Sequence, residues 1–241
     1  MSHTDTRQSE TPFRIGLIHA ALGSAAPLCA AIHYVLPDAV LKNFVNEEMR
    51  QYANRNGGVD AKAKRMFARQ VFLANESKVD LIIIACNIFA PFIDEIIPFT
   101  DVPVITVDNS MQEKAAAIGG RIGIIGTNSS AVPACRNGIL KKASAQGKTS
   151  IEFIDGTVTE AAQVLANGDT ERFDQLITEK ALTLMQLGCD AIVLAQVTIA
   201  RAKPALEKAG IAVPILTSPD ECAARVKQIV EELQLRRREK L

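Results

Sequence analysis

The chain has few of the residues that build disulfide frameworks or metal centres. It contains five cysteines, an odd number, and no two of them form a CxxC pair. Scattered cysteines of this kind argue against a disulfide framework and against a structural zinc site, and they favour reduced thiols in the cytoplasm. The three histidines do not form a metal-ligand cluster with these cysteines. We therefore expect no bound metal.

Long apolar segments and an excess of charge of one sign are also missing. No segment approaches the ~18 to 20 apolar residues that a membrane-spanning helix needs. Residues 1–11 are polar and lack the apolar stretch of a signal peptide, so we expect them to be a flexible tail. Lys and Arg together number 27, as do Asp and Glu, so no net charge favours nucleic acid or an anionic membrane as a partner.

Short apolar, β-branched runs alternate with amphipathic stretches along the whole chain. This alternation predicts an α/β protein with parallel sheets and helices on both faces of each sheet. The expected strands are FRIGLIH, DAVLKNFV, DLIIIAC, VPVITV, RIGIIGT, SIEFID, DAIVLAQ and VPILT. The main expected helices cover residues 59–77, 131–145, 170–187 and 220–235.

The order of these segments repeats once. RIGLIH returns as RIGIIG, DLIIIAC returns as DAIVLAQ, and VPVIT returns as VPILT, at offsets of 107, 110 and 111 residues. Three such blocks in the same order indicate an internal duplication into two similar lobes, each with its own parallel sheet. We expect residues 12–112 with 219–241 to form the first lobe and residues 113–218 to form the second, with an active-site cleft between them.

Different side chains follow the third strand of each predicted lobe. The first lobe has Cys86 and Asn87 at this place, whereas the second has Gln196. Ligands of open parallel sheets bind beyond the carboxyl ends of the strands. We therefore expect Cys86 and Gln196 to meet across one cleft.

A polar segment, GTNSS, follows the first strand of the second predicted lobe and precedes the helix at 131–145. Backbone N–H groups, hydroxyls and an amide would converge there at a helix N-terminus, which suits a carboxylate. Thr127, Asn128 and Ser129 are accordingly predicted to bind the substrate. A plain helix cap followed by a loop is the alternative.

These residues resemble the motifs of the aspartate/glutamate/hydantoin racemase superfamily, which includes maleate isomerase and arylmalonate decarboxylase. The strand that ends in Cys86 and Asn87 resembles the first motif, and residues 126–129 resemble the Gly-Thr loop of the family. The second motif, normally Gly-Cys-Thr, reads Ala-Gln-Val-Thr at 195–198, so Gln196 stands in place of the second cysteine. The resemblance covers nearly the whole chain and implies a homodimer or higher homo-oligomer.

The racemases of this family need no cofactor. One cysteine thiolate removes the proton next to a carboxylate, and a thiol on the opposite face returns one. The resemblance thus implies a small carboxylic acid or amino-acid derivative as substrate and Cys86 as the reactive thiol. Pro91 indicates a helix start after Cys86, which would lower the pKa of this thiol. Gln196 does not titrate near neutral pH, so it could only orient a group or place a water.

Several reactions remain open for a single thiol. Cys86 could act as one acid/base group in a racemisation or isomerisation, or it could add covalently to an activated double bond or carbonyl. A lyase or decarboxylase of the same superfamily is one alternative. A non-catalytic protein that binds small acids is another.

Four further residues are candidates for the cleft. Asn87 and Thr198 are expected beside the reactive carbon. His19 ends the first strand, where it could supply the missing acid/base group or be a hydrogen-bonded core residue. Glu47 follows the second strand, where it could line the cleft or begin a solvated helix.

Overall fold

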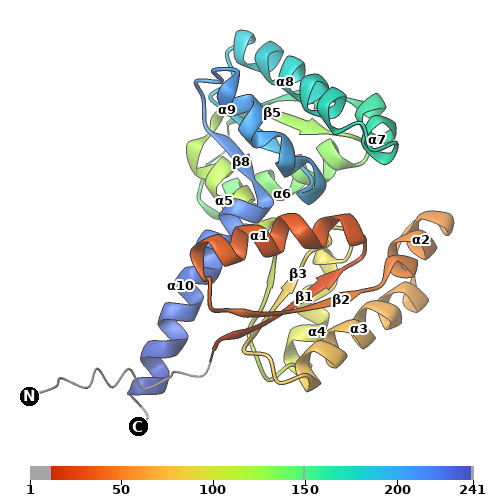
Figure 1. The fold of residues 1–241 in the computed structure, drawn as a ribbon, viewed down its shortest axis with the longest axis vertical. Coiled ribbons are helices and arrows are strands. Elements are labelled where there is room, and N and C mark those ends of the chain that lie inside the picture. The colour runs from red at the N-terminus through yellow and green to blue at the C-terminus, as the bar shows by residue number, and fades with distance from the viewer. Residues whose placement is uncertain (1–11, 149, 240–241) are drawn as a thin grey trace, which may run out of the picture.

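Two lobes make up the molecule, and the computed structural model describes residues 12–148 and 150–239 of it. The tail expected at 1–11 lies outside these described residues. In Figure 1 the first lobe runs from red to yellow and lies below the second, which is mainly green to blue. Each lobe contains one four-stranded parallel sheet. The α/β class and the two-lobe arrangement expected from the sequence are therefore confirmed.

All eight expected strands are present. The order in the first sheet is β2-β1-β3-β4, and the order in the second is β6-β5-β7-β8. The strands are β1 (Arg14–His19), β2 (Val40–Val45), β3 (Leu81–Ile84), β4 (Val104–Thr106), β5 (Gly120–Gly126), β6 (Ile151–Thr157), β7 (Ala191–Leu194) and β8 (Ile215–Thr217). The central strands β3 and β7 are buried throughout, as parallel strands covered by helices on both faces should be.

Helices cover both faces of each sheet, and the four long helices expected from the sequence appear as α3, α6, α8 and α10. The α-helices are α1 (Ala25–Val35), α2 (Glu47–Arg55), α3 (Ala61–Glu76), α4 (Ile93–Ile96), α5 (Asn109–Ile118), α6 (Ala131–Ala145), α7 (Thr159–Ala166), α8 (Thr170–Gln186), α9 (Lys203–Lys208) and α10 (Ser218–Arg238). Four short 3₁₀ helices, η1 (Leu22–Ser24), η2 (Ala90–Phe92), η3 (Ile97–Phe99) and η4 (Val197–Ala202), follow strand ends or flank α4.

The duplication extends to the pairing register of the strands. Ile15 pairs with Leu81 in the first sheet, and Ile122 pairs with Ala191 in the second, at the sequence offsets of 107 and 110 residues. In both lobes, the pair of central strands also begins with an equivalent hydrogen bond from a backbone N–H to an aspartate. The Arg14 N–H donates to Asp80 Oδ2 at 2.8 Å, and its counterpart donates to Asp190 at 2.7 Å.

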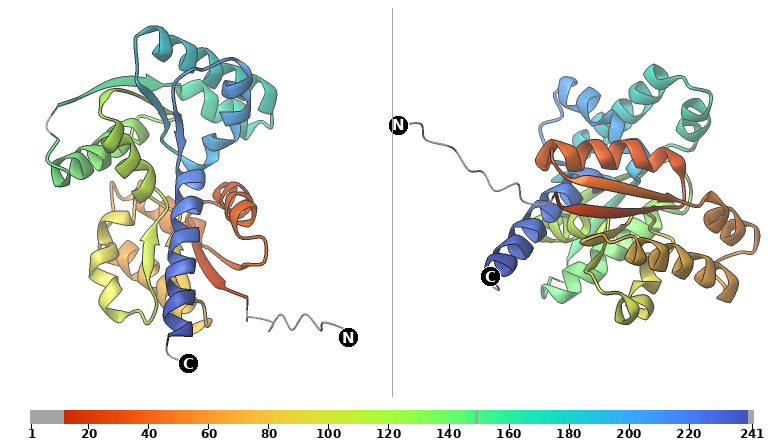
Figure 2. Two further views of the ribbon diagram at one scale, coloured as in Figure 1. Left: turned by 90° about the vertical axis from the view of Figure 1, so that its left-hand side faces the viewer. Right: turned by 60° about the horizontal axis from the view of Figure 1, so that its bottom comes forward.

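Each lobe receives a helix from the end of the other lobe's sheet. Helix α5 follows β4 of the first sheet, yet its Met111 and Ala115 belong to the apolar core on one face of the second sheet. Helix α10 follows β8 of the second sheet, yet its Cys222 and Val226 pack with Leu28 of α1 in the core of the first sheet. Figure 2 shows α10 running the length of the first lobe. The lobe limit expected after residue 112 falls within α5, and the exact limits stay a prediction.

Candidate active site

Cys86 and Gln196 stand at equivalent backbone positions beyond β3 and β7. The Ala85 N–H donates to the Ile18 carbonyl at 2.8 Å, and the Ala195 N–H makes the corresponding bond in the second lobe at 2.9 Å. The two residues that follow, Cys86 and Gln196, are both only partly exposed. The same backbone geometry therefore presents a thiol from one lobe and an amide from the other.

The Cys86 thiol lies in a largely desolvated place. Burial raises its pKa to about 11, because a thiolate loses hydration there. Backbone hydrogen bonds from Ile88 and Phe89 and the positive charge of Arg50 act to lower the pKa, whereas the charge of Asp108 acts to raise it. Desolvation is the largest of these effects, so Cys86 carries its proton at neutral pH.

This result corrects the expected direction of the Cys86 pKa shift. Pro91 does lie in the first turn of a helical segment, but that segment is η2, which has three residues and leads into the four-residue α4. Helices this short align few peptide dipoles and stabilise an anion weakly. Burial therefore prevails, and the predicted lowering of the pKa is wrong.

Gln196 is held by the loop after β5. Its carbonyl oxygen Oε1 accepts a hydrogen bond from the Thr127 N–H at 2.8 Å and another from the Thr127 hydroxyl at 3.0 Å. Thr127 is itself buried. The amide of Gln196 thus occupies the two donors that the sequence suggested for a substrate carboxylate.

The next residues of this loop divide between capping and solvent. Asn128 Oδ1 accepts hydrogen bonds from the Ser130 N–H at 3.1 Å, the Ser130 hydroxyl at 2.9 Å and the Ala131 N–H at 2.9 Å. Asn128 therefore caps the first turn of α6, while its side-chain N–H₂ has no partner among the described residues. Ser129 is exposed to solvent. A ligand at this loop would meet the donor groups of Asn128 and Ser129 first.

His19 is fully buried at the end of β1, and both of its ring nitrogens have partners. Nδ1 lies 2.7 Å from the Ser24 hydroxyl, and Nε2 lies 2.9 Å from Asn43 Oδ1. Burial lowers the pKa of His19, and the hydrogen bond to Asn43 offsets this in part. These contacts hold a neutral ring inside the first lobe, as expected for a hydrogen-bonded core residue.

Helix α2 places two charged residues beside the loop after β1. Glu47 is exposed, and its Oε1 accepts a hydrogen bond from the Leu22 N–H at 3.0 Å. One turn later, Arg50 Nε donates to the Ala20 carbonyl at 3.2 Å. Since the Arg50 charge acts on the Cys86 thiol, α2 supplies a cation to the neighbourhood of the site.

Thr198 lies in η4, where the two lobes touch. A Cβ added at Gly23 in η1 would lie 3.6 Å from Thr198 Cγ2, which is ordinary van der Waals contact. The methyl group of Thr198 therefore packs against the loop that follows β1 of the other lobe.

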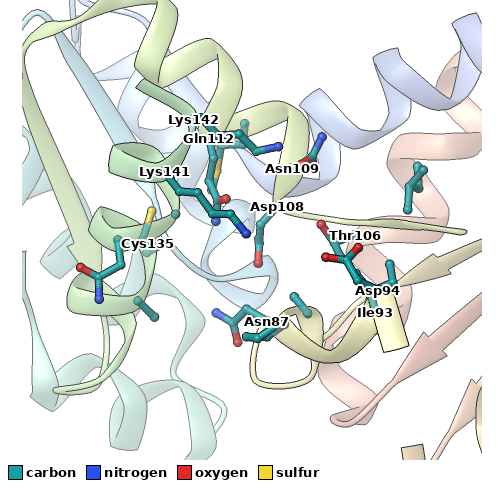
Figure 3. A pocket seen from close by; sticks show the side chains of 18 of the residues that line it. Asn87, Ile93, Asp94, Thr106, Asp108, Asn109, Gln112, Cys135, Lys141 and Lys142 are labelled. Carbon is teal, nitrogen blue, oxygen red and sulfur yellow. The ribbon is translucent and has the colours of Figure 1, made fainter. Parts of the chain in front are cut away.

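A cavity of about 680 Å³ lies between α4, β4 and α5 and the facing helix α6. It reaches Asn87 and Ala195, the sequence neighbours of Cys86 and Gln196. Figure 3 shows Asn87 and Asp108 directed into the same space, with Lys141 extending toward it from α6. Of the site residues predicted from the sequence, Asn87 is the one that lines this cavity.

Asp108 is the least expected group of the cavity. It follows β4 and precedes α5, and only 6% of its surface is exposed. Burial raises the pKa of this carboxyl to about 6, and the neighbouring Ser218 side chain offsets part of the rise. Its charge also raises the pKa values of the Cys86, Cys135 and Cys222 thiols.

Within residues 12–148 and 150–239, no group of three or more His, Cys, Asp or Glu side chains could hold a metal ion. In the same part of the chain, no helix is long and apolar enough to cross a membrane.

A comparison with protein families decides the relationship of the chain. The model of the Asp/Glu/hydantoin racemase family matches residues 19–226, most of the chain. The chain belongs to the Asp/Glu/hydantoin racemase family. The family resemblance noted from Cys86, Asn87 and the Gly-Thr loop is thereby confirmed.

Solved structures of racemases share the fold of this family member. A glutamate racemase isoform from Bacillus anthracis is 22% identical with a TM-score of 0.68, and the match covers 91% of this chain and 82% of that one. An aspartate racemase homologue from Pyrococcus horikoshii is 13% identical with a TM-score of 0.66, over 90% and 99% of the two chains. An allantoin racemase from Klebsiella pneumoniae is 19% identical with a TM-score of 0.62, over 91% and 88%. No curated protein sequence matches this chain significantly.

Sequence reasoning missed three charged residues around the racemase-family cleft. Asp108 had a signal, because it directly follows the fourth strand of the first lobe, at the same sheet edge as Cys86. Arg50 and Lys141 had none, because they lie on exposed helix surfaces where most charges are merely solvated. Only the packing of α2 and α6 brings them near the strand ends.

Proposed function

We propose that this chain is a cofactor-independent isomerase that acts at a carbon next to a carboxylate or carbonyl. Its substrate is a small organic acid or an amino-acid derivative, and Cys86 is its reactive thiol. The supporting observation is the asymmetry of the two strand ends. Cys86 carries a titratable proton, whereas Gln196 is an amide bound to Thr127. Proton transfer therefore depends on Cys86 and not on a pair of thiols.

The protonated state of Cys86 assigns its role in the resting enzyme. A thiol with a pKa of about 11 is a proton donor at neutral pH, and its thiolate forms when it gives that proton to carbon. The positive charge of Arg50 favours the thiolate. The backbone N–H groups of Ile88 and Phe89 stabilise the same charge. Asn87, at the edge of the cavity, is placed to orient the substrate carboxylate.

The test follows exchange of the α-proton for deuterium by NMR in D₂O. The panel contains amino acids, hydantoins, hydroxy acids and substituted malonates, and the proteins are the wild type, Cys86→Ser and Cys29→Ser. Cys29 is a matched control because its thiol is also half-buried but lies on α1. We expect exchange with at least one compound, loss in Cys86→Ser and retention in Cys29→Ser.

Two other outcomes define the alternatives. Loss of carbon dioxide from a malonate, dependent on Cys86, would identify a decarboxylase of the family. Thermal stabilisation by acids without any exchange or conversion would identify a binding protein, a reading that the Gln196–Thr127 contact favours. The homo-oligomeric state and the cytoplasmic location stay predictions.

A further inference from the structure

The missing second acid/base group of the site has a candidate in the cavity that adjoins Asn87. A two-face proton transfer needs a second group that titrates, and Gln196 does not. Asp108 is a carboxyl that is more than nine-tenths buried, projects into the cavity and has no cationic partner among the described residues. A buried carboxyl without a cationic partner is costly to fold and calls for an explanation.

We propose that Asp108 is the second acid/base residue of this enzyme and that it exchanges protons with the substrate in concert with Cys86. The proposal rests on the function proposed above. Its geometric basis is the pairing of β3 with β4: Ile84 pairs with Thr106, so Cys86 and Asp108 each stand two residues beyond a paired position at the same edge of the sheet. The charge of Asp108 reaches the Cys86 thiol, and Asn87 lies between the two in sequence and lines the cavity with Asp108.

The two environments give the groups opposite protonation states at neutral pH. The Asp108 carboxyl, with a pKa of about 6, is ionised and can accept a proton. The Cys86 thiol, with a pKa of about 11, is neutral and can donate one. Two titratable groups whose pKa values are pushed apart in this way form an acid/base pair.

The proposed steps balance in protons and charge. The Asp108 carboxylate takes the proton from the α-carbon, and the bonding electron pair moves onto the adjacent carboxylate or carbonyl oxygen. The electron pair then returns from this oxygen to the α-carbon, which takes the proton of the Cys86 thiol and leaves a thiolate. Once Asp108 is neutral, it no longer repels this thiolate, so the two steps favour each other. A proton passes from Asp108 to Cys86 through water and restores the resting enzyme.

The surroundings of Asp108 suit an anionic substrate. Lys142 on α6 is paired with Glu113 at 3.0 Å, whereas the Lys141 ammonium has no acidic partner among the described residues. Lys141 is thus available to bind a substrate carboxylate at the cavity. The other groups near Asp108 are Asp94 on α4 and the thiols Cys135 and Cys222, whose raised pKa values keep them neutral. Loss of the pH response near pH 6 in Asp108→Asn would therefore identify Asp108 as its source.

The test compares Asp108→Asn with the wild type on the compound that the wild type exchanges fastest. Asp38→Asn is the matched control, because Asp38 is exposed and lies outside the cavity. We expect Asp108→Asn to lose about 10²-fold or more in exchange rate and to lose the acidic limb of the rate profile. A purely structural role would lower the rate without removing that limb. Asp108→Ser provides a second variant should Asp108→Asn fail to give a native circular dichroism spectrum.

A direct titration accompanies the kinetics. The carboxyl of Asp108 is observed by ¹³C NMR and assigned by its absence in the variant, and its midpoint should lie near 6. An ordinary midpoint near ~4 would overturn the proposal, because the carboxyl would then be an ordinary ionised acid. Exchange that Cys86→Ser abolishes and Asp108→Asn leaves intact would refute the role of Asp108 alone. No exchange by the wild type would refute the proposed function and this role with it.

Discussion

The two lobes share one backbone framework and place different chemistry at its end. Strand order, pairing register and the opening Asp bond are the same in both sheets. At the strand ends the first lobe has Cys86, whereas the second has Gln196 bound to Thr127. The framework is maintained by packing, which depends on the whole lobe, while a strand end can change without disturbing it. The two lobes therefore differ in the side chain that follows their third strand, a thiol in the first lobe and an amide in the second.

The largest effect should come from replacing the Cys86 thiol of the first lobe. Cys86→Ser keeps the size of the side chain but replaces the thiol by a hydroxyl that does not ionise in the working range. We expect α-proton exchange to fall by about 10³-fold, with little change in thermal stability. Deuterium incorporation measured by NMR decides this. A variant that retains more than about a tenth of the wild-type rate would show that the lobes do not differ in the way described.

The pH dependence of stability should reveal the buried carboxyl of the first lobe. Because the folded-state pKa of Asp108 is about 6 and lies above the ordinary 3.8, folding favours its protonated form. Its contribution to the unfolding free energy is therefore full at low pH and is lost as pH rises toward 6, by at most about 3 kcal/mol. Urea denaturation of the wild type and Asp108→Asn between about pH 4 and 7 measures the difference. Parallel curves for the two proteins would contradict it.

Removing the Gln196 side chain of the second lobe should have a smaller effect on the unfolding free energy. Gln196→Ala leaves the buried Thr127 N–H without its acceptor, and we expect a loss of about 1 to 3 kcal/mol in unfolding free energy. Gln196→Glu is the matched variant, because a carboxylate can accept the same two bonds, and it should be the more stable of the two. Added malonate should stabilise Gln196→Ala more than the wild type, since a carboxylate can fill the vacated place. Equal stability of all three proteins would show that the contact is incidental.

The smallest effect concerns equivalent glycines of β1 and β5. A Cβ at Gly123 would lie 2.9 Å from Leu184 Cδ1 and 3.0 Å from Cys189 Sγ, whereas a Cβ at Gly16 would meet Ala74 at 3.4 Å. We expect Gly123→Ala to lose about 1 to 2 kcal/mol in unfolding free energy through overpacking. Gly16→Ala should stay within about 0.5 kcal/mol of the wild type. Thermal and urea denaturation of both variants would test whether the lobes pack as differently as these distances indicate.

Most of the fold could be predicted from the sequence, because strands such as β3 and helices such as α3 depend on local patterns. The buried run LIII and the side chain of Asp60, which caps α3 through the N–H groups of Lys62 and Ala63, are both readable in the chain. The packing of α5 and α10 against the other lobe could not be predicted from the sequence as readily. The pattern of an amphipathic helix shows that one of its faces is apolar. Which of the two sheets packs against that face depends on the path of the chain between the lobes.

The positions of the candidate residues Cys86 and Gln196 could be read from the sequence, whereas their contacts could not. The position of Cys86 and the substitution at Gln196 follow from the repeat. The bond from Gln196 to Thr127, the cap made by Asn128 and the neutral ring of His19 do not, because each joins atoms whose separation depends on side-chain packing.

The sequence by itself determined the two α/β lobes, their relationship to the racemase family and the inequality of Cys86 and Gln196. These properties depend on the order and periodicity of residues along the chain. Only the tertiary structure decided the raised pKa values of the Cys86 thiol and the buried Asp108 carboxyl. It also decided that the Gln196 amide is bound to Thr127. Desolvation and charge interactions act between segments that are distant in sequence, so their balance exists only once α2, α5 and α6 are packed around the strand ends.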